Sequence, residues 1–117
     1  MRKLILILMI LPLCSFSQLD DATKHMAVSH ALSTTIGVTV YEITESPLKA
    51  IVYSFIGANI IGFGKELHDK YIKGTQFSWR DIGNNNWGIT ISTITLIPYI
   101  DQRQRDKRRM QKFRQFD

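Results

Sequence analysis

The polar and apolar positions divide the chain into three long apolar segments separated by helix-breaking or strongly polar residues. The first, residues 21–44, contains no proline and has Asp20 or Asp21 in a position to cap a helix. The second, residues 47–70, opens with a proline, which is well tolerated in a first helical turn. We therefore predict a helix over each of these segments.

The third segment, residues 79–97, is expected to be helical as well. Ser78 and Asp81 have the spacing of a capping box, and Pro98 is expected to disturb the helix at its far end. The β-branched stretch Ile89–Ile97 alternates as a strand would. A single strand would have no partner to pair with, so we predict helix.

Charge is absent from long parts of these segments, namely Ala50–Gly64 and Gly88–Ile100. Helices that are apolar on all faces belong to the core of a large protein or to a membrane, and a small domain cannot surround three of them. Ala58 and Gly62 form a small-xxx-small pair suited to close helix packing. We predict an all-α protein, a three-helix up-down-up bundle that is membrane-embedded or membrane-associated. A soluble bundle is the alternative.

The N-terminal residues 1–17 have the layout of a secretory signal. Arg2 and Lys3 precede an apolar run that is short for a membrane span, and small residues follow it. We predict a signal helix cleaved after Ser17, and an exported protein at the bacterial inner membrane or the periplasmic face of the cell envelope. An uncleaved N-terminal anchor is the rival interpretation.

Cys14 is the only cysteine, so a disulfide within the chain and a cysteine metal site are both excluded. It could carry a lipid at the end of a lipoprotein signal. Leu13 precedes it where lipoprotein processing favours a small residue, so we favour simple cleavage and keep lipidation as the alternative.

The formal charge of +5 is concentrated at the C-terminus. Residues 18–100 hold six Lys or Arg and seven Asp or Glu, a net charge of −1, whereas residues 101–117 hold seven basic and three acidic residues, a net charge of +4. We interpret residues 18–100 as the helical domain and 101–117 as a basic tail on the cytoplasmic side of a membrane, as the positive-inside rule requires. Nucleic acid is not expected as a partner, and a protein partner or homo-oligomer stays open.

Helix direction predicts one polar cluster. In an up-down-up bundle, the start of the first helix, the end of the second and the start of the third lie at the same end. Those places hold the candidate site residues, which are Lys24, His25, Lys65, Glu66, Asp69, Ser78, Asp81 and Asn85.

Three chemical roles suit such a cluster. The cluster could bind a divalent cation through a histidine and carboxylates, and the candidate ligands are His25, Glu66, Asp69 and Asp81. We predict no cofactor from the sequence and keep the divalent cation as an alternative. Two helix N-termini with Lys24 and Arg80 could instead hold a phosphate group. The third role is an ion-paired plug that locks the helix ends together. Nothing in the spacing specifies nucleophilic catalysis, so the sequence leaves enzymatic activity open.

Three stretches of the chain, "DATKHMAVSHALS" (21–33), "GFGKELHDK" (62–70) and "FSWRDIGNNNWG" (77–88), resemble the YfiM-like family of periplasmic lipoproteins. The motifs of that family are approximately D-K-x-x-H, K-E-x-x-D and S-W-x-D-x-x-x-[DN]-x-x-G, in this order, and the chain resembles them. The matching positions are Lys24, His25, Lys65, Glu66, Asp69, Ser78, Trp79, Asp81, Asn85 and Gly88.

A looser similarity connects the same order of residues to VanZ-like membrane proteins. The YfiM-like resemblance implies an envelope location but brings no established activity. Leu13-Cys14 matches the lipoprotein cysteine of the family poorly, and the basic tail lies outside the resemblance. The sequence therefore favours a small envelope protein with a structural or partner-binding polar cluster. An enzyme or ligand-binding protein acting on a lipid, a phosphate group or a divalent cation is the alternative.

Overall fold

The computed structural model describes residues 20–116, which form three helices. They are α2 (Asp21–Thr44), α3 (Pro47–Tyr71) and α4 (Trp79–Arg114). No strand occurs among these residues, so the all-helical prediction is confirmed for this part of the chain. The predicted signal segment, residues 1–17, lies outside the described residues.

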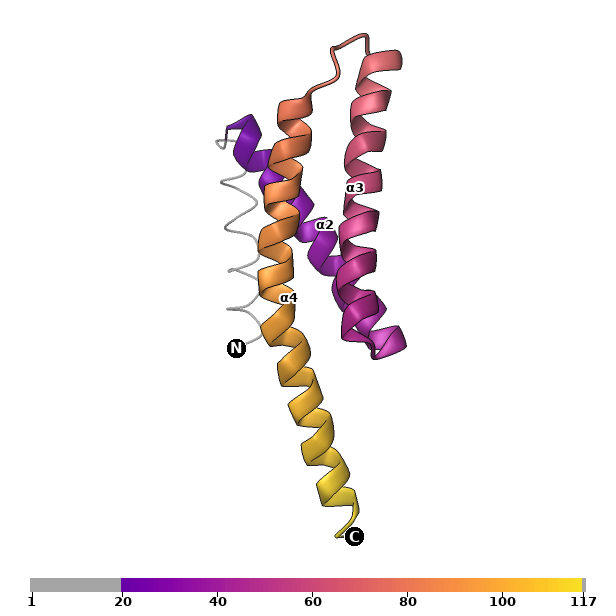
Figure 1. The fold of residues 1–117 in the computed structure, drawn as a ribbon, viewed down its shortest axis with the longest axis vertical. Helices are drawn as coiled ribbons and strands as arrows, with labels where there is room; N and C mark the ends of the chain where they lie inside the picture. The colour runs from indigo at the N-terminus through magenta and orange to yellow at the C-terminus, as the bar shows by residue number, and fades with distance from the viewer. Residues whose placement is uncertain (1–19, 117) are drawn as a thin grey trace, which may run out of the picture.

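The helices alternate in direction, and α2 crosses α4 obliquely while packing against both other helices (Figure 1). α3 and α4 contact each other least. The start of α2, the end of α3 and the start of α4 share one end of the bundle, as the alternating topology predicted (Figure 1).

Local signals in the sequence set where each helix begins. The Asp20 carboxylate accepts a hydrogen bond from the backbone N–H of Thr23, and the Ser46 hydroxyl accepts one from the N–H of Lys49 just before α3. These bonds satisfy backbone donors that have no partner inside the helix. Gly74 adopts a φ of 74° in the loop that leads to α4.

The third helix is longer than predicted. It does not end near residue 97 but continues through Pro98 to Arg114, beyond the ends of the other helices (Figure 1). Proline removes one backbone hydrogen bond. Leu96 and Ile100, on either side of Pro98, are both buried, so packing favours a continuous helix there. Part of the predicted tail is therefore a helical extension of the bundle.

Small side chains allow the helices to approach closely. The buried positions of α2 include Ser29, Ser33 and Gly37, at intervals of four residues. At Gly88 of α4, an added Cβ atom would lie 2.2 Å from the Met26 carbonyl oxygen of α2. Glycine is therefore required at this helix crossing.

The interior combines a few apolar side chains, such as Tyr41, Ile89 and Leu96, with small polar ones, and the surface carries many large apolar side chains. Ser33, Ser54 and Ser92 are fully buried, and Ser92 Oγ lies 2.9 Å from Thr34 Oγ1 across the α2–α4 contact. The exposed large apolar residues of α3 and α4 include Leu48, Val52, Phe55, Ile56, Ile60, Leu67, Trp87, Ile91, Ile94 and Ile97. Among the described helices, α3 alone meets simple criteria of length and hydropathy for a membrane span.

Candidate functional site

The three helices meet in a polar cluster at the shared end of the bundle. In it, His25 of α2 contacts two residues of α4. Its Nδ1 atom lies 3.2 Å from the side-chain oxygen of Asn85, and its Nε2 atom lies 3.3 Å from a carboxylate oxygen of Asp81. Because Asp81 and Asn85 are one helical turn apart, they contact the two nitrogens of the same imidazole ring.

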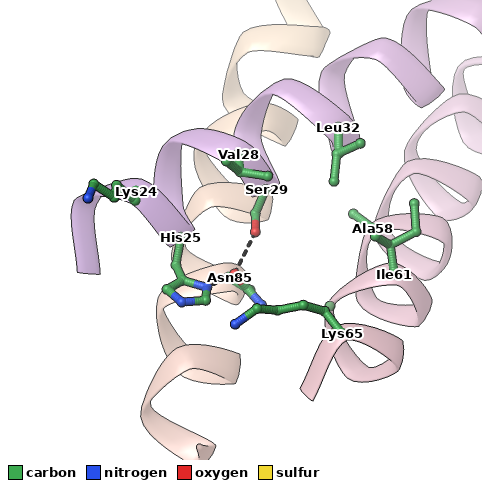
Figure 2. A pocket seen from close by; sticks show the side chains of 10 residues that line it. Lys24, His25, Val28, Ser29, Leu32, Ala58, Ile61, Lys65 and Asn85 are labelled. Carbon is green, nitrogen blue, oxygen red and sulfur yellow. Dashed lines mark hydrogen bonds between the residues drawn. The ribbon is translucent and has the colours of Figure 1, made fainter. Parts of the chain in front are cut away.

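Asn85 is almost completely buried and is held from several sides. Its side-chain oxygen accepts a hydrogen bond of 2.8 Å from the Ser29 hydroxyl (Figure 2). Gly62 of α3 passes so close that an added Cβ atom would lie 2.8 Å from the amide nitrogen of Asn85. These contacts fix the amide, and the amide fixes the imidazole of His25.

Glu66 is a buried carboxylate, with 1% of the residue exposed. One of its oxygens accepts a hydrogen bond of 3.0 Å from the backbone N–H of Ser78, and the other accepts one of 3.1 Å from Lys65 Nζ. The Ser78 hydroxyl in turn accepts a bond of 3.2 Å from the N–H of Asp81. The predicted capping box is thus only half formed within α4, since Glu66 of α3 replaces Asp81 as the acceptor for the N-cap N–H.

Asp69 lies on the outer side of the cluster. Lys65, one turn earlier in α3, and Lys73, just after the end of the helix, approach its two carboxylate oxygens at 3.0 Å and 3.3 Å. The contact with Lys73 is an ion pair. Asp69 is a neighbour of the cluster and not part of its centre.

Lys24 is the candidate that the structure leaves apart from the others. It lines a cavity of about 310 Å³ between α2 and α3, but its ammonium group points away from His25 (Figure 2). The cavity reaches His25, Lys65 and Asn85, and apolar side chains such as Leu32 and Ile61 form its other walls. The alternative of a phosphate group held by Lys24 and Arg80 stays a prediction.

Three of the four predicted metal ligands converge. His25, Glu66 and Asp81 each offer one ligand atom, and these atoms all lie within 4.8 Å of one another. Each residue comes from a different helix, so the site exists only in the assembled bundle. The group does not include the fourth candidate, Asp69.

A second polar contact lies at the opposite end and was not predicted. Arg103 of α4 donates two hydrogen bonds of 2.8 Å to the two carboxylate oxygens of Glu42 in α2. The Tyr99 hydroxyl donates a third, of 2.7 Å, to the same carboxylate. The bonds from Arg103 and Tyr99, in that order, lower the pKa of Glu42 to about 2. One turn further along α4, Lys107 pairs with Glu45, the residue that caps the end of α2.

Sequence reasoning missed Ser29 as a member of the cluster. Ser29 lies four residues after His25, on the same helical face, and this spacing could have indicated it. Arg103 was missed because the helix was expected to end before it.

Comparisons with known proteins give no further identification. A scan against protein-family models and searches of curated proteins and of solved structures found no match. The resemblance to the YfiM-like and VanZ-like families therefore stays a prediction from the quoted motifs.

Proposed function

We propose that the protein is a small membrane-embedded protein of the cell envelope. Its polar cluster would lock three helix ends together and present a surface to a partner on the periplasmic side. The observation that carries the proposal is the distribution of side chains: many large apolar residues are exposed on α3 and α4, and serines are buried at the helix contacts beside a small apolar core. Exposed large apolar side chains are unfavourable in water and favourable in lipid, where helices associate through small residues and hydrogen bonds.

The charge-free part of α3 supports the same environment. Lys49 and Lys65 bound it, and the sixteen helical steps from one lysine to the other rise by about 24 Å. A typical hydrocarbon core is ~30 Å thick, and lysine side chains can extend several ångströms towards the headgroups. The segment is therefore long enough to cross with modest thinning of the bilayer.

The residues at the two ends of the bundle are of the types that are enriched at membrane surfaces. Trp79 packs edge-to-face against Phe63 and Phe77 beside the polar cluster, and Trp79 is 72% exposed. Tryptophan is enriched at membrane interfaces. The basic residues after Arg103 lie beyond the other end, which is consistent with a cytoplasmic C-terminus and an exported N-terminus.

Membrane extraction tests the proposal. We expect the expressed full chain to stay in the membrane fraction after carbonate and high-salt washes and to dissolve only in detergent. Cysteine variants at Gly74 and Gln104 then test the orientation, with Cys14 replaced by serine. A membrane-impermeant thiol reagent should label position 74 from the periplasm and leave position 104 unlabelled until the cells are opened. Quantitative release by carbonate would contradict the membrane proposal.

The cavity beside the cluster favours a second candidate function, the binding of an anionic amphiphile. Its walls are mostly apolar, and Lys65 lies at its edge. An acyl chain would occupy the apolar part and an anionic headgroup would contact the lysine. Replacing Ile61 with tryptophan should fill the cavity and abolish co-purification of such a lipid. A lipid content equal to that of the unaltered protein would reject this candidate.

A further inference from the structure

Three metal-binding side chains from three helices point to one place in the polar cluster. We propose that His25, Glu66 and Asp81 form a binding site for a divalent transition-metal cation of the Zn²⁺ type. The inference goes beyond the proposed structural role and does not depend on where the helices lie relative to a membrane.

The distances suit such an ion. Two ligands at about 2.1 Å from a tetrahedral Zn²⁺ lie about 3.4 Å apart. His25 Nε2 and Asp81 Oδ2 are separated by 3.3 Å. The largest separation within the group is at most 4.8 Å, so the ligand atoms need to approach one another by up to about 1.4 Å for Glu66 to reach the same ion.

The imidazole of His25 is oriented as a metal ligand. The Asn85 side-chain oxygen accepts a bond from Ser29 and lies 3.2 Å from His25 Nδ1, so this nitrogen carries the proton. In the neutral ring, the Nε2 lone pair then faces the carboxylate of Asp81. Two lone pairs repel unless a cation lies between them. A histidine that donates one ring N–H to an oxygen and offers the other nitrogen to a metal is the usual second-shell arrangement.

The separation of 3.3 Å between His25 Nε2 and Asp81 is close to the spacing of two ligands on one ion. A metal ion differs from a proton on this nitrogen because it would also bind Glu66, which offers a ligand atom within 4.8 Å of the other two. Among the described residues, His25 is the only basic side chain paired with Asp81.

Glu66 has capacity left for a cation. Each of its oxygens accepts one hydrogen bond, from Ser78 N–H or from Lys65, and a carboxylate oxygen can accept two. The residue is 1% exposed, and a buried carboxylate requires compensating positive charge. Lys65 supplies part of it but is shared with Asp69. A bound cation would supply the rest.

The ligand set indicates the class of ion. One imidazole nitrogen and two carboxylate oxygens suit Zn²⁺ or Mn²⁺, whereas Mg²⁺ and Ca²⁺ favour oxygen ligands alone. Three protein ligands leave a coordination position open, which is typical of exchangeable or reactive ions rather than of closed structural sites.

The test uses the untagged full chain in detergent after removal of metals with a chelator. We expect titration calorimetry to show one equivalent of Zn²⁺ bound, and Co²⁺ in its place to give visible absorption bands typical of four-coordination. His25→Gln and Asp81→Asn should each weaken Zn²⁺ binding by about ten-fold or more. His68→Gln, which alters the same end of the bundle outside the group of three, should bind as the unaltered protein does.

Several results would overturn the proposal. They are the absence of stoichiometric Zn²⁺ binding by the unaltered chain, His25→Gln with unchanged affinity, and Mg²⁺ binding as tightly as Zn²⁺. Circular dichroism establishes whether each variant is folded. If the variants unfold, the unaltered chain still tests the proposal through chemical modification. We expect Zn²⁺ to protect His25 from diethyl pyrocarbonate. Modification of His25 at the same rate with and without Zn²⁺ would reject the site.

Discussion

The Glu66 carboxylate of α3 accepts a hydrogen bond of 3.0 Å from the backbone N–H of Ser78, the residue that caps α4. A buried acidic side chain of one helix thereby completes the N-terminal cap of the next. The same carboxylate is a member of the proposed cation site. Glu66 therefore connects the stability of the bundle with whatever the cluster binds.

Replacing Glu66 with alanine should destabilise the protein by about 1–3 kcal/mol, because the Ser78 N–H loses its acceptor in a buried place. Glu66→Gln keeps an amide oxygen that can accept this bond, so its loss of unfolding free energy should be clearly smaller. Thermal unfolding of the metal-free chain in detergent measures both. Equal losses for the two variants would show that the cap bond contributes little.

The crossing of α2 and α4 requires glycine at position 88, since an added Cβ atom would lie 2.2 Å from the Met26 carbonyl oxygen. Gly88→Ala should therefore separate the helices and cost about 1–3 kcal/mol of unfolding free energy. Gly83→Ala is the matched control in the same helix, because no atom lies within 4 Å of its added Cβ. It should stabilise the protein by up to about 1 kcal/mol through helix propensity. Unfolding followed by circular dichroism distinguishes the two, and similar effects would contradict the crossing.

Much of the cluster could be predicted from the sequence, because the direction of each helix depends only on the number of helices and on where each one begins and ends. Caps and a proline located the helix starts, and the alternation of directions then brought His25, Asp81 and Asn85 to one end. The roles of individual side chains were harder to predict. Glu66 accepts the Ser78 N–H, and Asp69 stays outside the centre of the cluster. This difference depends on how α3 is rotated about its axis, which the spacing of residues within one helix does not determine.

The length of α4 could not be predicted from local signals. Pro98 is a helix breaker in isolation. The contacts that favour continuation are non-local: Leu96 packs beside Gly37, and Arg103 reaches Glu42. Both partners lie more than fifty residues away in the sequence, so no pattern around the proline indicates them.

Acid should weaken the contact between the far ends of α2 and α4. The pKa of Glu42 is lowered from an ordinary 4.5 to about 2 by Arg103 and Tyr99, with Lys107 also nearby. A lowered pKa in the folded state means that the stabilisation is fully present above about pH 4.5 and is lost as the pH falls towards 2. We expect the unfolding temperature to fall over this range, and to fall less in Glu42→Gln. The side chain is partly exposed, so the effect will be modest. Identical pH profiles would contradict the assignment.

Asn85 provides the sharpest test of how the cluster orients its histidine. Its side-chain oxygen lies 3.2 Å from His25 Nδ1, so Asn85→Ala removes the group that fixes the ring and should weaken Zn²⁺ binding by about 10–100-fold. Asn86→Ala is the matched control, because the Asn86 amide bonds only to the Ile82 carbonyl oxygen of its own helix. Titration of both variants with Zn²⁺, alongside their thermal unfolding without metal, separates ligand orientation from packing. Equal Zn²⁺ affinities in the two variants would mean that Asn85 does not position His25 for metal binding.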